Sequence, residues 1–270
     1  MHVRSAGHGA FAAALIVVGS LGLRHGVMSL IGEDLTPRLA GVPALVDACD
    51  LLFIACGAGL LLMRTAAAAA RTLLGFVLLW LVALKLRYVL SGPFVEGSYQ
   101  SCGEAAAILA GAWVLYASLA TPWERQHLRL ASGDIGLRLA RGVYALALIA
   151  FGASHFAYLA LTARLVPSWL PWHTVWACFT GAAYLAAAAA ILLDRYASLA
   201  AALCAVQMGA FTSLVWVPVI LAGKISRFDW NELFLSATLT AAGWIVADSY
   251  RGARSRTAST LVARSEPARR

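Results

Sequence analysis

Long apolar runs alternate with short polar segments along the whole chain. Eight of these runs reach or approach the length of about 20 residues that a helix needs to cross a bilayer. They lie near residues 10–31, 42–63, 72–90, 103–120, 139–161, 173–193, 199–222 and 232–247. The runs are continuous and lack the strict alternation of barrel strands, so the pattern predicts about eight transmembrane helices.

Composition supports an all-α integral membrane protein. Of the 270 residues, 61% are hydrophobic and only 13% are charged, whereas soluble domains average roughly half apolar and a quarter charged. The net charge of +8 could suggest nucleic acid. However, the basic residues lie mainly in short loops and in residues 251–270, so membrane orientation explains them better and no nucleic-acid partner is expected.

The basic residues also predict the orientation in the membrane. An even number of spans places both termini on one side. The opposite side then holds seven of the 21 lysines and arginines, namely Arg24, Arg38, Lys85, Arg87, Arg164, Lys224 and Arg227. Because cytoplasmic loops carry the excess of positive charge, we expect a multi-pass protein with both termini in the cytoplasm.

The two halves of the chain match each other at a separation of about 130 residues, a spacing typical of internal duplication. The matching pairs are Gly22 and Gly152, His25 and His155, Leu90 and Leu221, Gly92 and Gly223, and Trp113 and Trp244. We expect two tandem, parallel four-helix-bundle repeats, over residues 1–120 and 139–249. A cytoplasmic linker, 121–138, joins them, and a basic, disordered cytoplasmic tail, 250–270, follows.

Ionisable residues gather in the outer third of the predicted first repeat. They are Arg24, His25, Asp47, Asp50, Lys85, Arg87 and Glu104. Each costs about 2.5 to 3.5 kcal/mol on insertion scales, so such residues mark candidate functional sites. The two aspartates share a helix face and are expected to oppose Arg24, and Glu104 is expected to oppose Lys85 or Arg87.

This cluster has two interpretations. In the first, it lines a polar pocket open to the periplasm that binds a small anion, a quinone head group or a proton. In the second, the residues lie at the interface, where long side chains reach water and acids cap helix starts, and no ligand is needed.

The second half offers a smaller set of candidates, His155, Gln207 and Glu232. His25 and His155 could together ligate a haem, but no second haem motif accompanies them, so quinone is the preferred cofactor hypothesis. The five cysteines form no metal-binding spacing, and no metal site is expected. A disulfide between Cys49 and Cys102 is an open alternative.

Residues 142–249 resemble the DoxX-like family of bacterial membrane proteins, which are four-helix units. The stretches that carry the resemblance are Gly152 with His155 and Phe156, residues 166–171, Trp176 with Thr180 and Gly181, and residues 230–234. The N-terminal half is a more divergent copy. The resemblance implies the bacterial inner membrane and a membrane or periplasmic redox partner, but it carries over no catalytic residues.

Three functions therefore stand side by side. The preferred one is an accessory or redox-associated membrane component, which as an enzyme would be an oxidoreductase subunit coupled to quinone. The second is a transporter of a small solute, and the third is a structural membrane protein without a ligand. Only Pro218 lies in the interior of a span, whereas transporters often interrupt paired spans, and this difference favours the first function.

Overall fold

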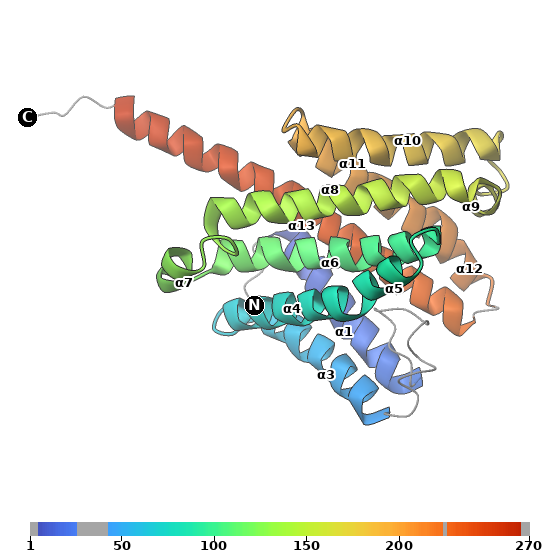
Figure 1. Cartoon of the computed structure of the whole chain (residues 1–270), viewed down its shortest axis with the longest axis horizontal. Coiled ribbons are helices and arrows are strands. Elements are labelled where there is room, and N and C mark those ends of the chain that lie inside the picture. Colours follow the sequence, from blue (N-terminus) through green and yellow to red (C-terminus); the bar gives the residue numbers. More distant parts are fainter. Residues whose placement is uncertain (1–4, 26–42, 224–225, 266–270) are drawn as a thin grey trace, which may run out of the picture.

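All regular elements of the described residues are helices. The computed structural model describes residues 5–25, 43–223 and 226–265. The helices are α1 (Ala6–His25), α3 (Pro43–Leu60), α4 (Ala66–Trp80), α5 (Leu86–Ser91), α6 (Glu96–Leu119), α7 (Pro122–His127), α8 (Gly133–Ala157), α9 (Leu159–Leu165), α10 (His173–Leu192), α11 (Ala197–Phe211), α12 (Val217–Leu221) and α13 (Arg227–Ser265) (Figure 1). Two π-helical turns, η2 (Leu81–Lys85) and η3 (Thr212–Trp216), continue α4 into α5 and α11 into α12.

Within the described residues, six helices are long and apolar enough to cross a membrane. They are α1, the continuous segment α4–η2–α5, α6, α8, α10 and the continuous segment α11–η3–α12. Large apolar side chains on their outer surfaces are exposed in the isolated chain, for example Leu79 by 66% and Phe179 by 60%. An apolar surface of this kind is stable in a lipid environment, which makes a multi-pass membrane protein plausible.

The helix bounds differ from the predicted runs at several places. The first run extends to residue 31, and its part beyond His25 lies outside the described residues. The fifth run contains a break at Tyr158, where α8 ends and α9 begins. The linker 121–138 contains α7 and the first turns of α8, and α13 continues to Ser265, through most of the segment expected to be a disordered tail.

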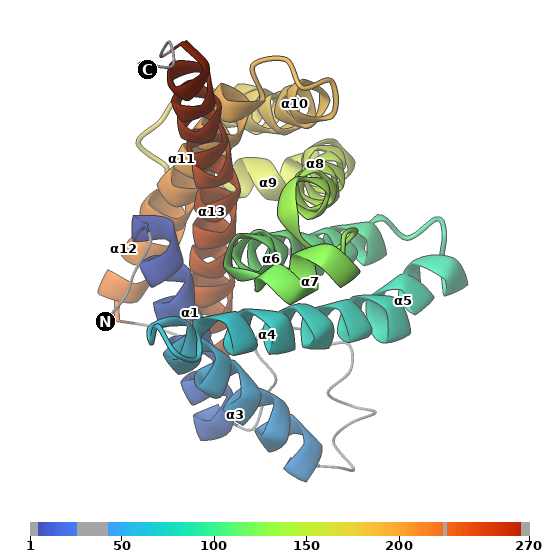
Figure 2. The same cartoon turned by 90° about the vertical axis from the view of Figure 1, so that its left-hand side faces the viewer.

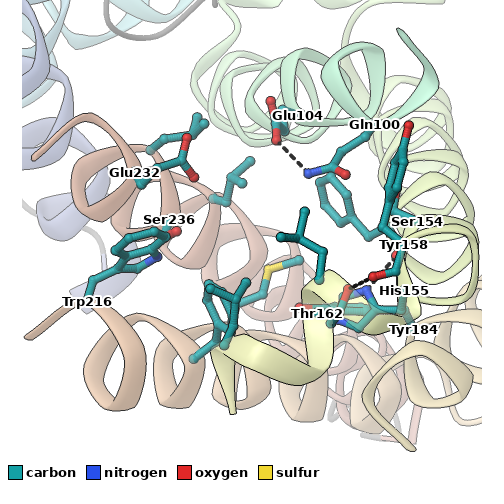
Figure 3. A pocket seen from close by; sticks show the side chains of 17 residues that line it. Gln100, Glu104, Ser154, His155, Tyr158, Thr162, Tyr184, Trp216, Glu232 and Ser236 are labelled. Carbon is teal, nitrogen blue, oxygen red and sulfur yellow. Dashed lines mark hydrogen bonds between the residues drawn. The ribbon is translucent and has the colours of Figure 1, made fainter. Parts of the chain in front are cut away.

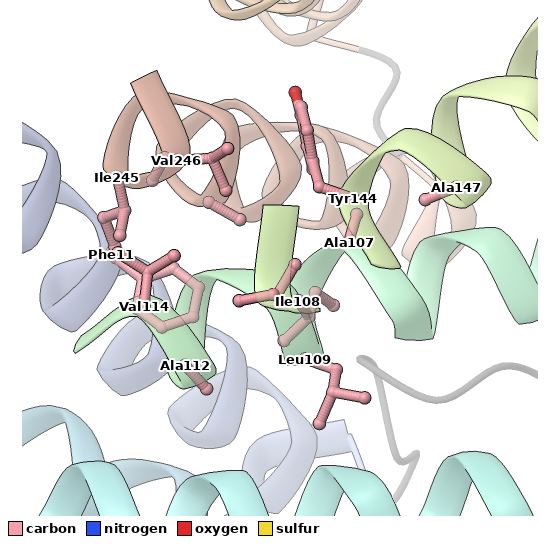
Figure 4. Close-up of a cluster of buried hydrophobic side chains, with 14 of the residues drawn as sticks. Phe11, Ala107, Ile108, Leu109, Ala112, Val114, Tyr144, Ala147, Ile245 and Val246 are labelled. Carbon is pink, nitrogen blue, oxygen red and sulfur yellow. The ribbon is translucent and has the colours of Figure 1, made fainter. Parts of the chain in front are cut away.

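Helix α6 lies at the centre of the bundle, against α4, α8 and α13 (Figure 2). Its buried side is rich in small residues, including Gly103, Gly111 and the run from Ala105 to Ala107. Small side chains let helix backbones approach closely, which is how membrane helices gain packing energy. Larger side chains such as Phe11 of α1 and Tyr144 of α8 fill the core around it (Figure 4).

The two π turns position inward-facing residues. Each turn ends on a buried side chain, Lys85 in η2 and Trp216 in η3. In the second turn the cause is visible in the sequence, because Pro218 has no N–H with which to continue the α-helical hydrogen bonding. Helix α5, which directly follows η2, contains no proline. Wide turns of this kind occur frequently at functional sites.

Candidate functional site

A cavity of about 210 Å³ lies between α6, α8, α9, α10, the α11–η3 segment and α13. It is near the end of the bundle formed by α5, α9 and α12, away from α7 (Figure 1). Its polar or aromatic lining residues are Gln100, Glu104, Phe151, Ser154, His155, Tyr158, Thr162, Tyr184, Phe211, Trp216, Glu232 and Ser236. Leucines and Met208 complete the walls. Its volume is below that of typical drug-sized pockets, so it suits a small molecule or a single-ring head group.

His155 occupies the last turn of α8, just before the break at Tyr158. Its Nδ1 lies 2.8 Å from the carbonyl oxygen of Phe151. A carbonyl can only accept, so Nδ1 carries the proton of the neutral ring, and Nε2 is left as an acceptor. The Tyr184 ring packs edge-on against the imidazole with centroids 5.4 Å apart, which fixes its plane.

Two carboxyl groups reach the same cavity from helices in different halves of the chain. Glu104 comes from α6 and Glu232 from α13, and Figure 3 shows Glu232 across the cavity from His155. The Gln100 side-chain amide donates to Glu104 Oε1 at 3.4 Å (Figure 3). Gln100 is four residues before Glu104, so the two share one helix face.

Ser154 connects the cavity wall to the start of α6. Its hydroxyl group donates to a carboxylate oxygen of Glu96 and also lies 2.9 Å from the carbonyl oxygen of Ala150. Glu96 is in the first turn of α6, where the helix dipole favours negative charge. The bond therefore joins the ends of α6 and α8 beside the cavity.

The structure separates the residues that the sequence grouped in the first repeat. Of the members whose side chains the structure describes, only Glu104 lines the cavity. Lys85 is buried, and its ammonium group donates to Ser101 Oγ at 2.5 Å. Arg24, Asp47 and Arg87 are exposed. The side chain of His25 lies outside the described residues.

The expected pairing of Asp50 with Arg24 is not formed. Asp50 is completely buried, and neither of its carboxylate oxygens has a hydrogen-bond partner among the described residues. Asp47, three residues earlier, is exposed. A three-residue spacing puts two side chains on one helix face, but it does not fix their depth below the neighbouring helix.

The second-half candidates have different positions. His155 and Glu232 line the cavity. Gln207 does not, because its side-chain amide donates to the carbonyl oxygen of Thr180 at 3.1 Å and so links α11 to α10.

Sequence reasoning missed Gln100, Ser154, Tyr184 and Trp216. Two signals could have found some of them. Gln100 precedes Glu104 by one helical turn, and Pro218 marks the distorted turn that contains Trp216. Nothing in the local sequence distinguishes Tyr184 from an ordinary core aromatic.

All five cysteines are free thiols, so Cys49 and Cys102 are not bridged. In the described part of the chain no group of three or more histidines, cysteines or acidic residues could hold a metal ion. The lining of the cavity consists of hydrogen-bonding, aromatic and aliphatic side chains.

Comparison with protein-family models, with curated proteins and with solved structures found no match to this chain.

Proposed function

We propose that this chain is an accessory or redox-associated component of the bacterial inner membrane, of the DoxX-like type, that binds a quinone or quinol head group in the cavity near His155. The observation that carries the proposal is the convergence of an oriented imidazole and two carboxyl groups inside a cavity whose other walls are largely apolar and aromatic. Binding sites for small organic ligands combine mostly apolar walls with a few placed polar groups in this way.

The chemistry of the lining matches a flat ring with polar groups at its ends. A quinol donates through two hydroxyl groups, and His155 Nε2 and the carboxylates of Glu104 and Glu232 accept. A quinone accepts instead, and the hydroxyl group of Tyr158 and the second N–H of the Gln100 amide are donors within the same lining. Tyr184 and Trp216 supply flat surfaces. Among the side chains that the structure describes, no lysine or arginine lines the cavity, which makes a small anion the poorer ligand.

An eight-span fold of two parallel repeats belongs to the same proposal. Helix α3 has 18 residues and packs on α1 and α4, and α13 packs on α1, α6 and α11. The support for a repeat is that corresponding elements of the two halves start a constant number of residues apart. The π turns begin at Leu81 and at Thr212, 131 positions later, and α6 and α13 begin at Glu96 and Arg227, also 131 positions apart.

Packing between the halves is reciprocal under the same correspondence. Helix α6 packs on α8, and its counterpart α13 packs on α1. Within each half, α1 packs on α3 as α8 packs on α10, and α4 packs on α6 as α11 packs on α13. This is the pattern expected of two units related by an axis along the membrane normal.

The correspondence also accounts for a cavity in the second half. Shifting Lys85 and Ser101 by 131 positions gives Trp216 and Glu232, which both line the cavity. In the first half the same two positions are occupied by the Lys85–Ser101 hydrogen bond. In this proposal the two halves diverged at these positions, so that the second half holds the ligand site and the first half supports it structurally.

The experiment is direct binding to the purified full-length chain in lipid nanodiscs. The probes are a short-chain ubiquinone analogue and its quinol, measured by titration calorimetry, together with mass spectrometry of the lipid extract. We expect the wild type to bind saturably. His155→Ala or Glu104→Gln should each bind about tenfold more weakly, because the loss of one hydrogen bond of about 1.4 kcal/mol raises the dissociation constant about tenfold.

His127→Ala is the matched control. His127 is exposed on α7, at the far end of the bundle, so this variant should bind as the wild type does. The proposal is wrong if the wild type retains no quinone and binds neither probe, or if the His127 and His155 variants lose affinity equally.

Solute transport is a second candidate, and the paired π turns favour it. Interrupted segments at corresponding positions of two repeats often mark transporter binding sites, and η2 and η3 occupy such positions. Quinone binding without flux of any tested solute into proteoliposomes would argue for the redox-associated function, and flux without quinone binding would argue for transport.

A further inference from the structure

Asp50 packs directly on a glycine of the neighbouring helix. A Cβ atom added to Gly22 would lie 2.3 Å from the carboxyl carbon and from both carboxyl oxygens of Asp50. One turn earlier, a Cβ added to Gly19 would lie 2.4 Å from the Asp50 carbonyl oxygen. The α1–α3 crossing therefore encloses the backbone and the side chain of this single acidic residue, which is 0% exposed.

The ionisable groups that the structure describes on the surrounding helices do not neutralise it. Helix α1 contributes Arg24, which is exposed, and His25, whose side chain lies outside the described residues. Helix α4 contributes Arg71, which pairs with Glu124 at 2.9 Å. On α3 itself, Asp47 is exposed and Cys49 is a buried thiol. No ion pair within the described residues includes Asp50.

An ionised carboxylate at the position of Asp50 has an unfavourable free energy. A buried carboxylate without a cation or a hydrogen-bond donor costs several kcal/mol, and the neutral acid costs much less. Ionisable residues within spans are costly, and those that are retained commonly mark proton or ion pathways. The fit of the carboxyl group against Gly22 gives it no room to move to the surface without separating α1 from α3.

We infer that Asp50 is a proton-binding site within the membrane, separate from the cavity near His155. At neutral pH the side chain is a carboxylic acid held in the α1–α3 crossing. Release of the proton breaks the O–H bond and transfers H⁺ to water, leaving both electrons of the bond on the carboxylate and requiring no redox partner. The new charge cannot stay in the dry crossing, so proton release is coupled to opening or hydration of the α1–α3 contact.

Infrared spectroscopy of the full chain in nanodiscs tests this inference. The C=O stretch of a protonated carboxyl group is distinct from the carboxylate bands. We expect such a band at neutral pH in the wild type, its loss in Asp50→Asn, and its retention in Asp47→Asn, the matched exposed control. An unchanged band in Asp50→Asn would overturn the inference.

A second measurement does not depend on the variant folding. Wild-type chain prepared with carbon-13-labelled aspartate should show an isotope shift of the protonated-carboxyl band, which separates aspartate from the glutamates of the cavity. If the wild type shows no isotope-sensitive protonated band at neutral pH, Asp50 is ionised and the inference fails. The cavity proposal stands or falls separately, because it involves neither Asp50 nor Gly22.

Discussion

Single glycines set the distance between helices in this chain. Gly22 of α1 lies against Asp50 of α3, and Gly152 of α8 lies so near α10 that an added Cβ would be 2.9 Å from the Gly181 carbonyl oxygen. A Cβ on Gly181 would be 2.7 Å from the Cβ of His155. Because Gly152 and Gly181 have no side chains, the backbones of α8 and α10 approach closely beside His155, which lines the cavity.

We expect Gly22→Ala to lower the free energy of unfolding by about 1–3 kcal/mol, the usual cost of overpacking a filled site. Thermal unfolding in detergent measures this. Gly75→Ala is the control, because nothing lies within 4 Å of its added Cβ, and in mid-helix this change should stabilise by roughly 0.5–1 kcal/mol. Equal behaviour of the two variants would show that the α1–α3 crossing is not tightly packed.

At the scale of elements, α7 is held by one buried carboxylate. Glu124 accepts from the Thr121 backbone N–H at 2.8 Å and from the Thr121 hydroxyl at 2.9 Å, and Thr121 in turn caps the helix by accepting from the Glu124 N–H. Arg71 of α4 forms an ion pair with the other carboxylate oxygen of Glu124 at 2.9 Å. This network joins the loop between α6 and α8 to α4, and it lies at the opposite end of the bundle from the cavity.

The stability that Glu124 provides should depend on pH. The hydrogen bond from the Thr121 backbone holds the pKa of Glu124 below its ordinary value of 4.5, the Thr121 hydroxyl and Arg71 act in the same direction, and burial opposes them. A lowered folded-state pKa contributes stability that is complete above 4.5 and is lost as the pH falls through the folded value.

We therefore expect the midpoint of thermal unfolding of the wild type to fall more steeply below pH 4.5 than that of Glu124→Gln. Asp248→Asn serves as control, because its ion pair with Arg251, whose side chain is 68% exposed, joins residues three apart on one helix. It should leave the wild-type pH profile unchanged. Parallel profiles for the wild type and Glu124→Gln would contradict the assignment.

At the scale of the whole molecule, the proposed eight-span fold makes a prediction about topology. Alkaline phosphatase is active only outside the cytoplasm, and we expect activity to alternate along a series of fusions. Fusions should be inactive after Thr65, Thr121, Arg195 and Tyr250, and active after Pro93, Ser168 and Gly223. Activity after Thr65 or Tyr250 would mean that α3 or α13 does not cross, leaving fewer than eight spans.

Part of this architecture could be predicted and part could not. The apolar runs predicted the helices, because any segment in lipid must satisfy its own backbone hydrogen bonds. The candidate site was only partly predictable. Glu104, His155 and Glu232 could be singled out as polar residues in apolar runs, but Lys85 and Asp50 could not be separated from them, because their depth depends on which neighbouring helix covers them.

Composition and hydropathy along the chain were enough to predict the helical class and the long apolar segments. These properties follow from local composition and from hydrogen bonding within each helix. The packing of the helices was needed to show that Glu104 of α6, His155 of α8 and Glu232 of α13 line one cavity. It also showed that Asp50 is enclosed elsewhere, against Gly22. The physical reason is that helix crossings are set by contacts between side chains far apart in the chain, where a single glycine changes how closely two backbones approach.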